Sequence, residues 1–186
     1  MLECTRFKSL KSTKPVATVS IASVLEEIKS DKYRDAILEI RKDEAPSKSL
    51  LKDKLPCFTP TGVFNHRSIA GMENYNGVIC LDIDHVEDVK TLKSRASNLN
   101  YVHAAYITPS GNGLKVIIKT NATPETYKSV EAKVAEYFYS DCGAVRDNRC
   151  KDIARIQFVS YDPELYYNED SYRLNLDQYV QGAETN

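Results

Sequence analysis

Several features that define other classes of protein are missing from these 186 residues. No apolar run approaches the roughly 18 residues that a membrane-spanning helix needs. The first residues also contain no apolar segment of the kind that directs secretion. We therefore expect a cytoplasmic protein without a membrane partner. The net charge is only −1, from 25 basic and 26 acidic residues. Proteins that coat nucleic acid without selectivity are strongly basic, so that class is disfavoured.

Paired cysteines are missing as well. The five cysteines form no CxxC pair and lie at Cys4, Cys57, Cys80, Cys142 and Cys150. An odd, scattered set is typical of reduced thiols in a cytoplasmic protein. A zinc site that combines two of them, Cys142 and Cys150, with a histidine is the alternative, although the spacing lacks the usual ligand pairs.

The first 55 residues are predicted to form a helical N-terminal subdomain after one short strand near Thr5–Lys8. Ser20 can cap a helix whose apolar residues, from Ile21 to Ile28, recur at helical spacing. A second helix follows around Tyr33–Ile40, and a short third helix is expected over Ser47–Lys52.

The pattern changes after Gly77. Successive segments favour a strand, a helix, two strands, a helix and a strand, at residues 78–84, 87–98, 101–108, 114–119, 123–140 and 153–160. The order β-α-β-β-α-β is that of the ferredoxin-like unit. We therefore predict an α+β protein with a ferredoxin-like domain over residues 56–175 and a tail or linker over 176–186.

The strongest chemical signal lies at the end of the first of these strands. Asp82 and Asp84 alternate with apolar residues, so their carboxylates project from one face about 7 Å apart. Two carboxylates in this arrangement can share divalent cations. The alternative is that they end a strand and cap the next helix.

A glycine-containing turn, Thr108-Pro-Ser-Gly-Asn-Gly-Leu-Lys115, joins the second and third strands. Glycine allows a ligand to approach the backbone closely, but Asn-Gly is also a strong signal for a plain hairpin turn. In a ferredoxin-like sheet with strand order 4-1-3-2, one edge would collect Asp82, Asp84, this turn, Lys115, and Asp147 or Asp152. Acids, a cation and exposed amides together suit metal-bound phosphates.

These residues resemble the archaeo-eukaryotic primase and primase-polymerase superfamily. That family has an acidic hxDhD strand, a Ser-Gly-x-Gly-x-His strand start, and a third acid before a later strand. The matches here are Asp82 with Asp84, then Ser110-Gly-Asn-Gly-Leu-Lys115, then Asp147 with Asp152-Ile-Ala-Arg155 behind it. The resemblance extends to the N-terminal domain of VirE-like proteins from mobile elements, through Leu55-Pro-Cys-Phe-Thr-Pro-Thr-Gly-Val-Phe64 and Phe158-Val-Ser-Tyr-Asp-Pro163.

The resemblance implies a palm-type domain that performs metal-dependent, template-directed nucleotidyl transfer in the replication of a mobile element. It implies Mg²⁺ or Mn²⁺ on Asp82, Asp84 and Asp147, with Asp152 as the alternative third acid. Phosphates would be bound by Ser110, Gly111, Gly113, Lys115 and Arg155. The implied partners are nucleoside triphosphates, a single-stranded DNA template and a C-terminal helicase-like ATPase domain. Two residues depart from the family pattern: Lys115 replaces the commoner histidine, and Arg146 precedes Asp147 in place of an apolar residue.

Three rival functions stay open at this stage. They are a non-catalytic nucleic-acid-binding module, a metal-dependent nuclease or phosphodiesterase, and a degenerate adaptor domain of a longer replication protein. Among the other candidates, His85, His103, and His66 with Arg67 are expected to serve ordinary structural or solvated roles. The basic residues at 146, 149, 151 and 155 form either a solvated face or a phosphate-binding cluster.

Overall fold

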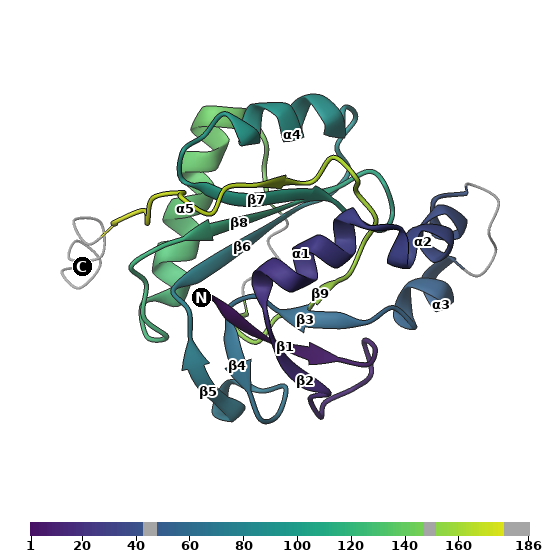
Figure 1. The fold of residues 1–186 in the computed structure, drawn as a ribbon. Coiled ribbons are helices and arrows are strands. Elements are labelled where there is room, and N and C mark those ends of the chain that lie inside the picture. Colours follow the sequence, from purple (N-terminus) through teal and green to yellow (C-terminus); the bar gives the residue numbers. More distant parts are fainter. Residues whose placement is uncertain (43–47, 147–151, 177–186) are drawn as a thin grey trace.

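The computed structural model describes residues 1–42, 48–146 and 152–176, which form a mixed α and β structure (Figure 1). Five α-helices occur in these residues: α1 (Ile21–Lys29), α2 (Arg34–Arg41), α3 (Lys48–Asp53), α4 (Val89–Ser97) and α5 (Tyr127–Cys142). Short 3₁₀ turns cover Asp31–Tyr33 and Ile69–Gly71. No helix of the described residues is long and apolar enough to cross a membrane.

One four-stranded sheet, the central sheet, carries the predicted acidic strand. Its order is β10-β7-β8-β6, and every neighbouring pair is antiparallel. The strands are β6 (Val78–Ile83), β7 (Val102–Ile107), β8 (Leu114–Lys119) and β10 (Tyr166–Tyr167).

A second four-stranded sheet, the N-terminal sheet, combines the start of the chain with two later segments. Its order is β2-β1-β3-β9, again antiparallel throughout. The strands are β1 (Glu3–Phe7), β2 (Ala17–Ser20), β3 (Cys57–Thr59) and β9 (Gln157–Phe158). A separate hairpin pairs β4 (Gly62–Phe64) with β5 (Met72–Tyr75).

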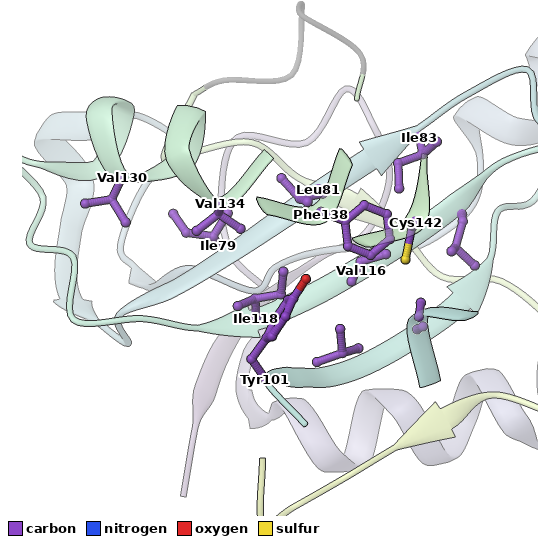
Figure 2. Close-up of a cluster of buried hydrophobic side chains, with 14 of the residues drawn as sticks. Ile79, Leu81, Ile83, Tyr101, Val116, Ile118, Val130, Val134, Phe138 and Cys142 are labelled. Carbon is purple, nitrogen blue, oxygen red and sulfur yellow. The ribbon is translucent and has the colours of Figure 1, made fainter. Parts of the chain in front are cut away.

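Both faces of the central sheet are covered, which explains why its strands are apolar nearly throughout. On one face α4 and α5 pack in a hydrophobic cluster, with Phe138 and Val134 of α5 over Leu81 and Val116 (Figure 2). On the other face α1, α2 and the N-terminal sheet contribute to a second cluster. A polar side chain on that second face is therefore enclosed between layers unless it lies at the end of a strand.

Most of the predicted helices are confirmed. Ser20 caps α1 through a hydrogen bond in which its Oγ accepts from the Ser23 N–H at 3.0 Å. The last helix begins later than predicted, at Tyr127. The Thr123 N–H donates to the Thr126 Oγ1 at 2.8 Å, and this closes a separate turn before the helix.

The prediction of a strand over 153–160 was wrong in length and in partner. Only Gln157–Phe158 forms a strand, and it pairs with β3 of the N-terminal sheet. Asp152 explains the short length, because its Oδ1 accepts from the Ala154 N–H at 2.9 Å and its carbonyl accepts from the Arg155 N–H. These bonds form a turn where the strand was expected.

The described residues therefore show the element order β6-α4-β7-β8-α5, followed by a strand in the other sheet. Of the predicted order 4-1-3-2, the pairing of β6 with β8 and of β8 with β7 is present, but no strand of the described residues pairs with the other side of β6. The far side of β7 pairs with β10, which was not predicted. The predicted tail over 176–186 lies outside the described residues except for Leu176, which is buried.

Candidate functional site

Asp82 and Lys115 face each other across neighbouring strands. They are direct partners in the β6–β8 register, and the Lys115 Nζ forms an ion pair with the Asp82 Oδ2. Both residues are buried, with 8% of Asp82 and 7% of Lys115 exposed. Their side chains lie on the face of the sheet that covers the second cluster, because Cys80 and Ile117, two positions away along each strand, belong to that cluster.

Asp84 follows the last residue of β6 and is exposed. The two acids thus differ: Asp82 is buried and neutralised by an ammonium group, whereas Asp84 is open to solvent. The sequence predicted that the two carboxylates lie close together, but not that one is buried in an ion pair and the other exposed.

The segment Thr108–Gly113 closes the β7–β8 hairpin and packs against the end of β6. The Thr108 N–H donates to the Gly113 carbonyl at 2.9 Å, and Gly111 has a positive φ of 84°. A Cβ on Gly113 would lie 2.8 Å from the Ile83 carbonyl oxygen and 3.1 Å from the Asp84 Oδ1. Only glycine allows the turn to approach Asp84 this closely. The hairpin interpretation is confirmed, and the phosphate-binding role stays a prediction.

A pocket of about 360 Å³ unites several of the predicted site residues. It lies where the end of β6 and the start of β8 meet β9 and the segment that leads into it. Its lining residues are Lys52, Asp82, Asp84, Thr108, Pro109, Lys115, Arg155, Ile156, Gln157 and Phe158. Four predicted residues, two acids and two cations, therefore share one pocket. Arg155 lies just before β9 of the N-terminal sheet, whereas the sequence analysis placed it on a strand next to β6.

Among the described residues, no third acid lines this pocket. Asp147 lies outside the described residues. Asp152 is exposed and lines a different pocket together with Ile69 and Tyr127. Among the described residues there is no group of three or more histidine, cysteine or acidic side chains that could hold a metal ion. The two carboxylates in the pocket nevertheless provide the hard oxygen ligands that Mg²⁺ and Mn²⁺ prefer.

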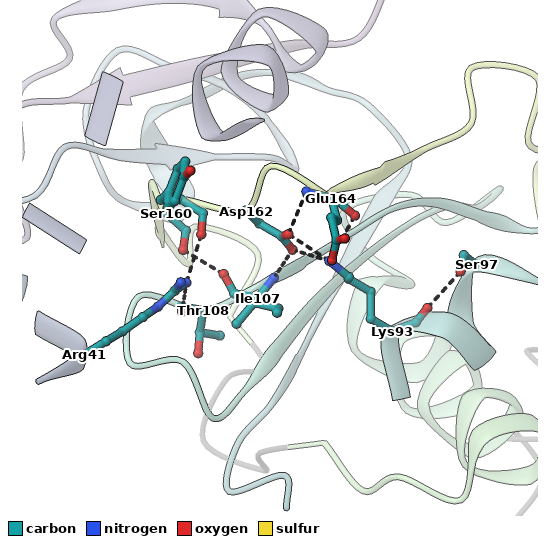
Figure 3. A network of polar contacts seen from close by, with 9 residues as sticks. Arg41, Lys93, Ser97, Ile107, Thr108, Ser160, Asp162 and Glu164 are labelled. Atoms are coloured by element: carbon teal, nitrogen blue, oxygen red, sulfur yellow. Dashed lines mark hydrogen bonds and ion pairs between the residues drawn. The ribbon is translucent and has the colours of Figure 1, made fainter. Parts of the chain in front are cut away.

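The sequence analysis did not predict the residues that hold Ile107 and Thr108, the second of which lines the pocket (Figure 3). Arg41 of α2 donates to the carbonyl oxygens of Thr108 at 3.1 Å and Tyr161 at 2.9 Å. Burial lowers the pKa of Arg41, while the nearby carboxylate of Asp162 opposes that shift. Arg41 also packs against Gly111, since a Cβ there would lie 3.3 Å from its side chain.

Asp162 ties the end of β7 to α4. Both of its carboxylate oxygens accept from the Lys93 Nζ at 2.8 Å, and its Oδ2 also accepts from the Ile107 N–H at 2.9 Å (Figure 3). Ser160 adds a bond from its Oγ to the Ile107 carbonyl at 2.7 Å. Ser160 and Asp162 both belong to the Phe158–Pro163 motif, which therefore holds Ile107, the residue just before Thr108 and the turn.

The other motif, Leu55–Phe64, positions the segment on the opposite side of the pocket. The Thr61 Oγ1 donates to the Ile153 carbonyl at 2.6 Å. Gly62 lies so close to β5 that a Cβ would meet the Asn74 carbonyl oxygen at 2.0 Å. This motif therefore fixes the chain shortly before Arg155.

The remaining candidates lie outside the pocket wherever the structure describes them. His103 is buried, burial lowers its pKa, and its Nδ1 lies 2.9 Å from the Asn168 carbonyl oxygen. His85 is exposed, with a positive φ of 57°. Arg146 forms an ion pair at 2.6 Å with buried Glu131, so it does not face solvent as a free cation. Burial raises the pKa of the Cys142 thiol to about 11, whereas Cys150 lies outside the described residues.

Comparison with known proteins gives one match. Residues 50–167, well over half of the chain, match the family model described as BT4734-like, N-terminal domain. No curated protein and no solved structure matches significantly. The matched range includes both motif segments, the acidic strand, the glycine turn and Arg155. The chain therefore belongs to the BT4734-like N-terminal domain family.

Proposed function

We propose that the pocket at the end of β6 binds a nucleoside triphosphate with divalent cations, and that the domain transfers nucleotides in the manner of a primase-polymerase. The observation that carries the proposal is the shared pocket itself, which gathers Asp82, Asp84, Lys115 and Arg155 from separate segments of the chain. Two acids for metal and two cations for phosphate are the complement that nucleotidyl transfer requires.

The roles of the described residues follow from their places in the pocket. Asp84, which is exposed, and Asp82 would hold Mg²⁺ or Mn²⁺. The third ligand, by the family resemblance, would be Asp147, which lies outside the described residues. When bound, such ions lower the pKa of an attacking 3′-hydroxyl and neutralise the leaving pyrophosphate. Lys115 and Arg155, which line the pocket, would bind phosphate oxygens. Ser110, Gly111 and Gly113 do not line it, and the Gly111 N–H already donates to the Thr108 carbonyl at 3.0 Å, so a phosphate role for the turn rests on the family resemblance alone.

The surrounding fold supports the same proposal. The succession β6-α4-β7-β8-α5 resembles the larger part of a palm-type, ferredoxin-like unit, with the acids at a strand end. A single-stranded DNA template would lie along the open side of the pocket. In a longer protein, a helicase-like ATPase domain would supply the unwound template for replication of a mobile element.

The direct test is a synthesis assay with single-stranded DNA, labelled NTPs or dNTPs, and Mg²⁺ or Mn²⁺. The wild type should make labelled polymer, and Asp84→Asn should reduce synthesis by about a hundredfold or more. Asp88→Asn is the matched control, because Asp88 is an exposed acid that caps α4 through the Thr91 N–H and asparagine caps equally well. Equal activity of Asp84→Asn and the wild type would refute the proposal.

One observation favours a second candidate, a non-catalytic domain that binds phosphates of nucleotides or nucleic acid. The Lys115 ammonium already neutralises Asp82, and a buried carboxylate in such a pair does not require a metal ion. This candidate predicts nucleotide or DNA binding without synthesis in the same assay. Degradation of the template would instead indicate a metal-dependent nuclease.

A further inference from the structure

The ion pair between Lys115 and Asp82 occupies the place where the proposed function needs a metal ligand. Both groups are mostly buried, and they face each other directly across β6 and β8. A buried pair of this kind is costly to break unless each partner finds a new one, because an unpaired charge would be left behind. A divalent cation that approaches the pocket alone must therefore displace an ammonium group from Asp82.

Asp84 cannot replace Asp82 in this respect. It is exposed at the strand end, so a cation bound to Asp84 alone would retain most of its water and bind weakly. Metal binding of useful strength at this edge of the sheet depends on the release of Asp82 from Lys115.

The same pocket has room for an anionic ligand that could release Asp82 from Lys115. Thr108 and Pro109 of the glycine turn, and Arg155 on the opposite side, line the space onto which Lys115 also faces. A polyphosphate chain in this space offers the Lys115 ammonium several anionic oxygens within the pocket. Lys115 can then exchange one anionic partner for another without being left unpaired.

We propose that Lys115 is a cation switch. In the absence of ligand it holds Asp82 and keeps metal out, and a bound polyphosphate draws it away and makes Asp82 available to Mg²⁺ or Mn²⁺. This inference rests on the proposed function, in that it takes the pocket to bind the polyphosphate of a nucleotide. Its consequence is that metal and polyphosphate favour each other's binding, and such coupling is reciprocal.

The first experiment measures the affinity for Mn²⁺ alone by electron paramagnetic resonance, which counts free Mn²⁺. Lys115→Gln removes the competing charge and retains an amide that can donate to Asp82. We expect Mn²⁺ to bind this variant about tenfold more tightly than the wild type, a change typical of coupled sites. Lys52→Gln is the matched control, because it removes the same charge from the same pocket, but the Lys52 Nζ lies over the Phe158 ring. It should change the affinity by less than about threefold.

The second experiment uses only the wild type, so it tests the switch even if Lys115→Gln fails to fold. Inorganic triphosphate is added to the wild type without metal, and the ammonium signals of lysine side chains are followed by NMR. The Lys115 signal should move as triphosphate binds. Triphosphate binding that leaves the Lys115 signal unchanged, or equal Mn²⁺ affinity of the wild type and Lys115→Gln, would overturn the switch and leave the proposed function standing. Failure of the wild type to bind triphosphate, both with and without Mn²⁺, would overturn both.

Discussion

The hydroxyl of Tyr106 has no hydrogen-bond partner among the described residues, although the side chain is fully buried. It lies on β7 opposite Lys115, on the face of the central sheet that meets α1 and the N-terminal sheet. Burial raises the pKa of Tyr106 well above its ordinary value, so the hydroxyl is protonated at neutral pH. A buried donor without an acceptor destabilises a fold by about 1–3 kcal/mol.

We therefore expect Tyr106→Phe to raise the free energy of unfolding by about 1 kcal/mol in urea titrations. Tyr101→Phe should have the opposite effect, because the Tyr101 hydroxyl donates to the Asp141 Oδ2 at 2.6 Å. Loss of stability in Tyr106→Phe would mean that the hydroxyl does have an acceptor.

The second prediction concerns the buried ion pair between Lys93 and Asp162. Asp162→Asn keeps an acceptor for the Ile107 N–H but leaves the Lys93 ammonium without a counter-charge, and we expect it to cost about 3–5 kcal/mol of stability. Lys133 and Glu136 on α5 form an equally short pair of 2.8 Å on the surface. Glu136→Gln should cost no more than about 0.5 kcal/mol, since exposed pairs contribute little. Denaturant unfolding measures the loss of stability in each variant. Similar losses in the two variants would show that the Lys93 ammonium does not need Asp162 as its counter-charge.

At the scale of elements, Glu27 of α1 ties that helix to β1. Burial raises its pKa, but hydrogen bonds from Arg6, Lys32 and Tyr33 outweigh burial and bring the pKa down from 4.5 to about 2. The folded-state pKa is thus below the unfolded one, so the stabilisation is fully present above about pH 4.5 and is lost as the pH falls towards 2.

Replacement of Glu27 by glutamine should therefore lower the melting temperature at pH 7 and flatten its dependence on pH between 4.5 and 2. Thermal unfolding of both proteins across that range measures the effect. The interpretation fails if the difference in melting temperature is the same at pH 7 and pH 2.5.

Elements with a strong local signal could be predicted from the sequence, and elements that depend on distant partners could not. The spacing of Val24, Leu25 and Ile28 after a serine cap defines α1 by itself. By contrast, β9 and β10 are two residues long and exist only because β3 and β7 offer free edges. The apolar residues Ile153 and Ile156 suggested a long strand. Ile153 is instead buried in a turn that Thr61 and Asp152 hold, and Ile156 is buried between that turn and β9.

At the scale of the whole molecule, the central sheet is enclosed by helices on one side and by helices and a second sheet on the other (Figure 1). Because both faces of the sheet are covered, its polar side chains can contact solvent only at the strand ends. The pocket lies at one such end, that of β6. The sequence predicted the part of the site that the β6–β8 register determines, namely Asp82, Asp84 and Lys115. Arg41 and Asp162 could not be assigned from spacing, because tertiary packing brings them to the turn from 67 and 55 residues away.

The central claim is that this pocket binds the polyphosphate of a nucleotide, and an equilibrium titration tests it most directly. Wild type, Arg155→Gln and Arg34→Gln would be titrated calorimetrically with a non-hydrolysable ATP analogue in Mg²⁺. A charge-assisted contact to phosphate contributes about 1.5–3 kcal/mol, so Arg155→Gln should bind about tenfold to a hundredfold more weakly. Arg34→Gln, an exposed control on α2, should bind as the wild type does. Equal affinities for all three proteins, or no binding by the wild type, would contradict the account.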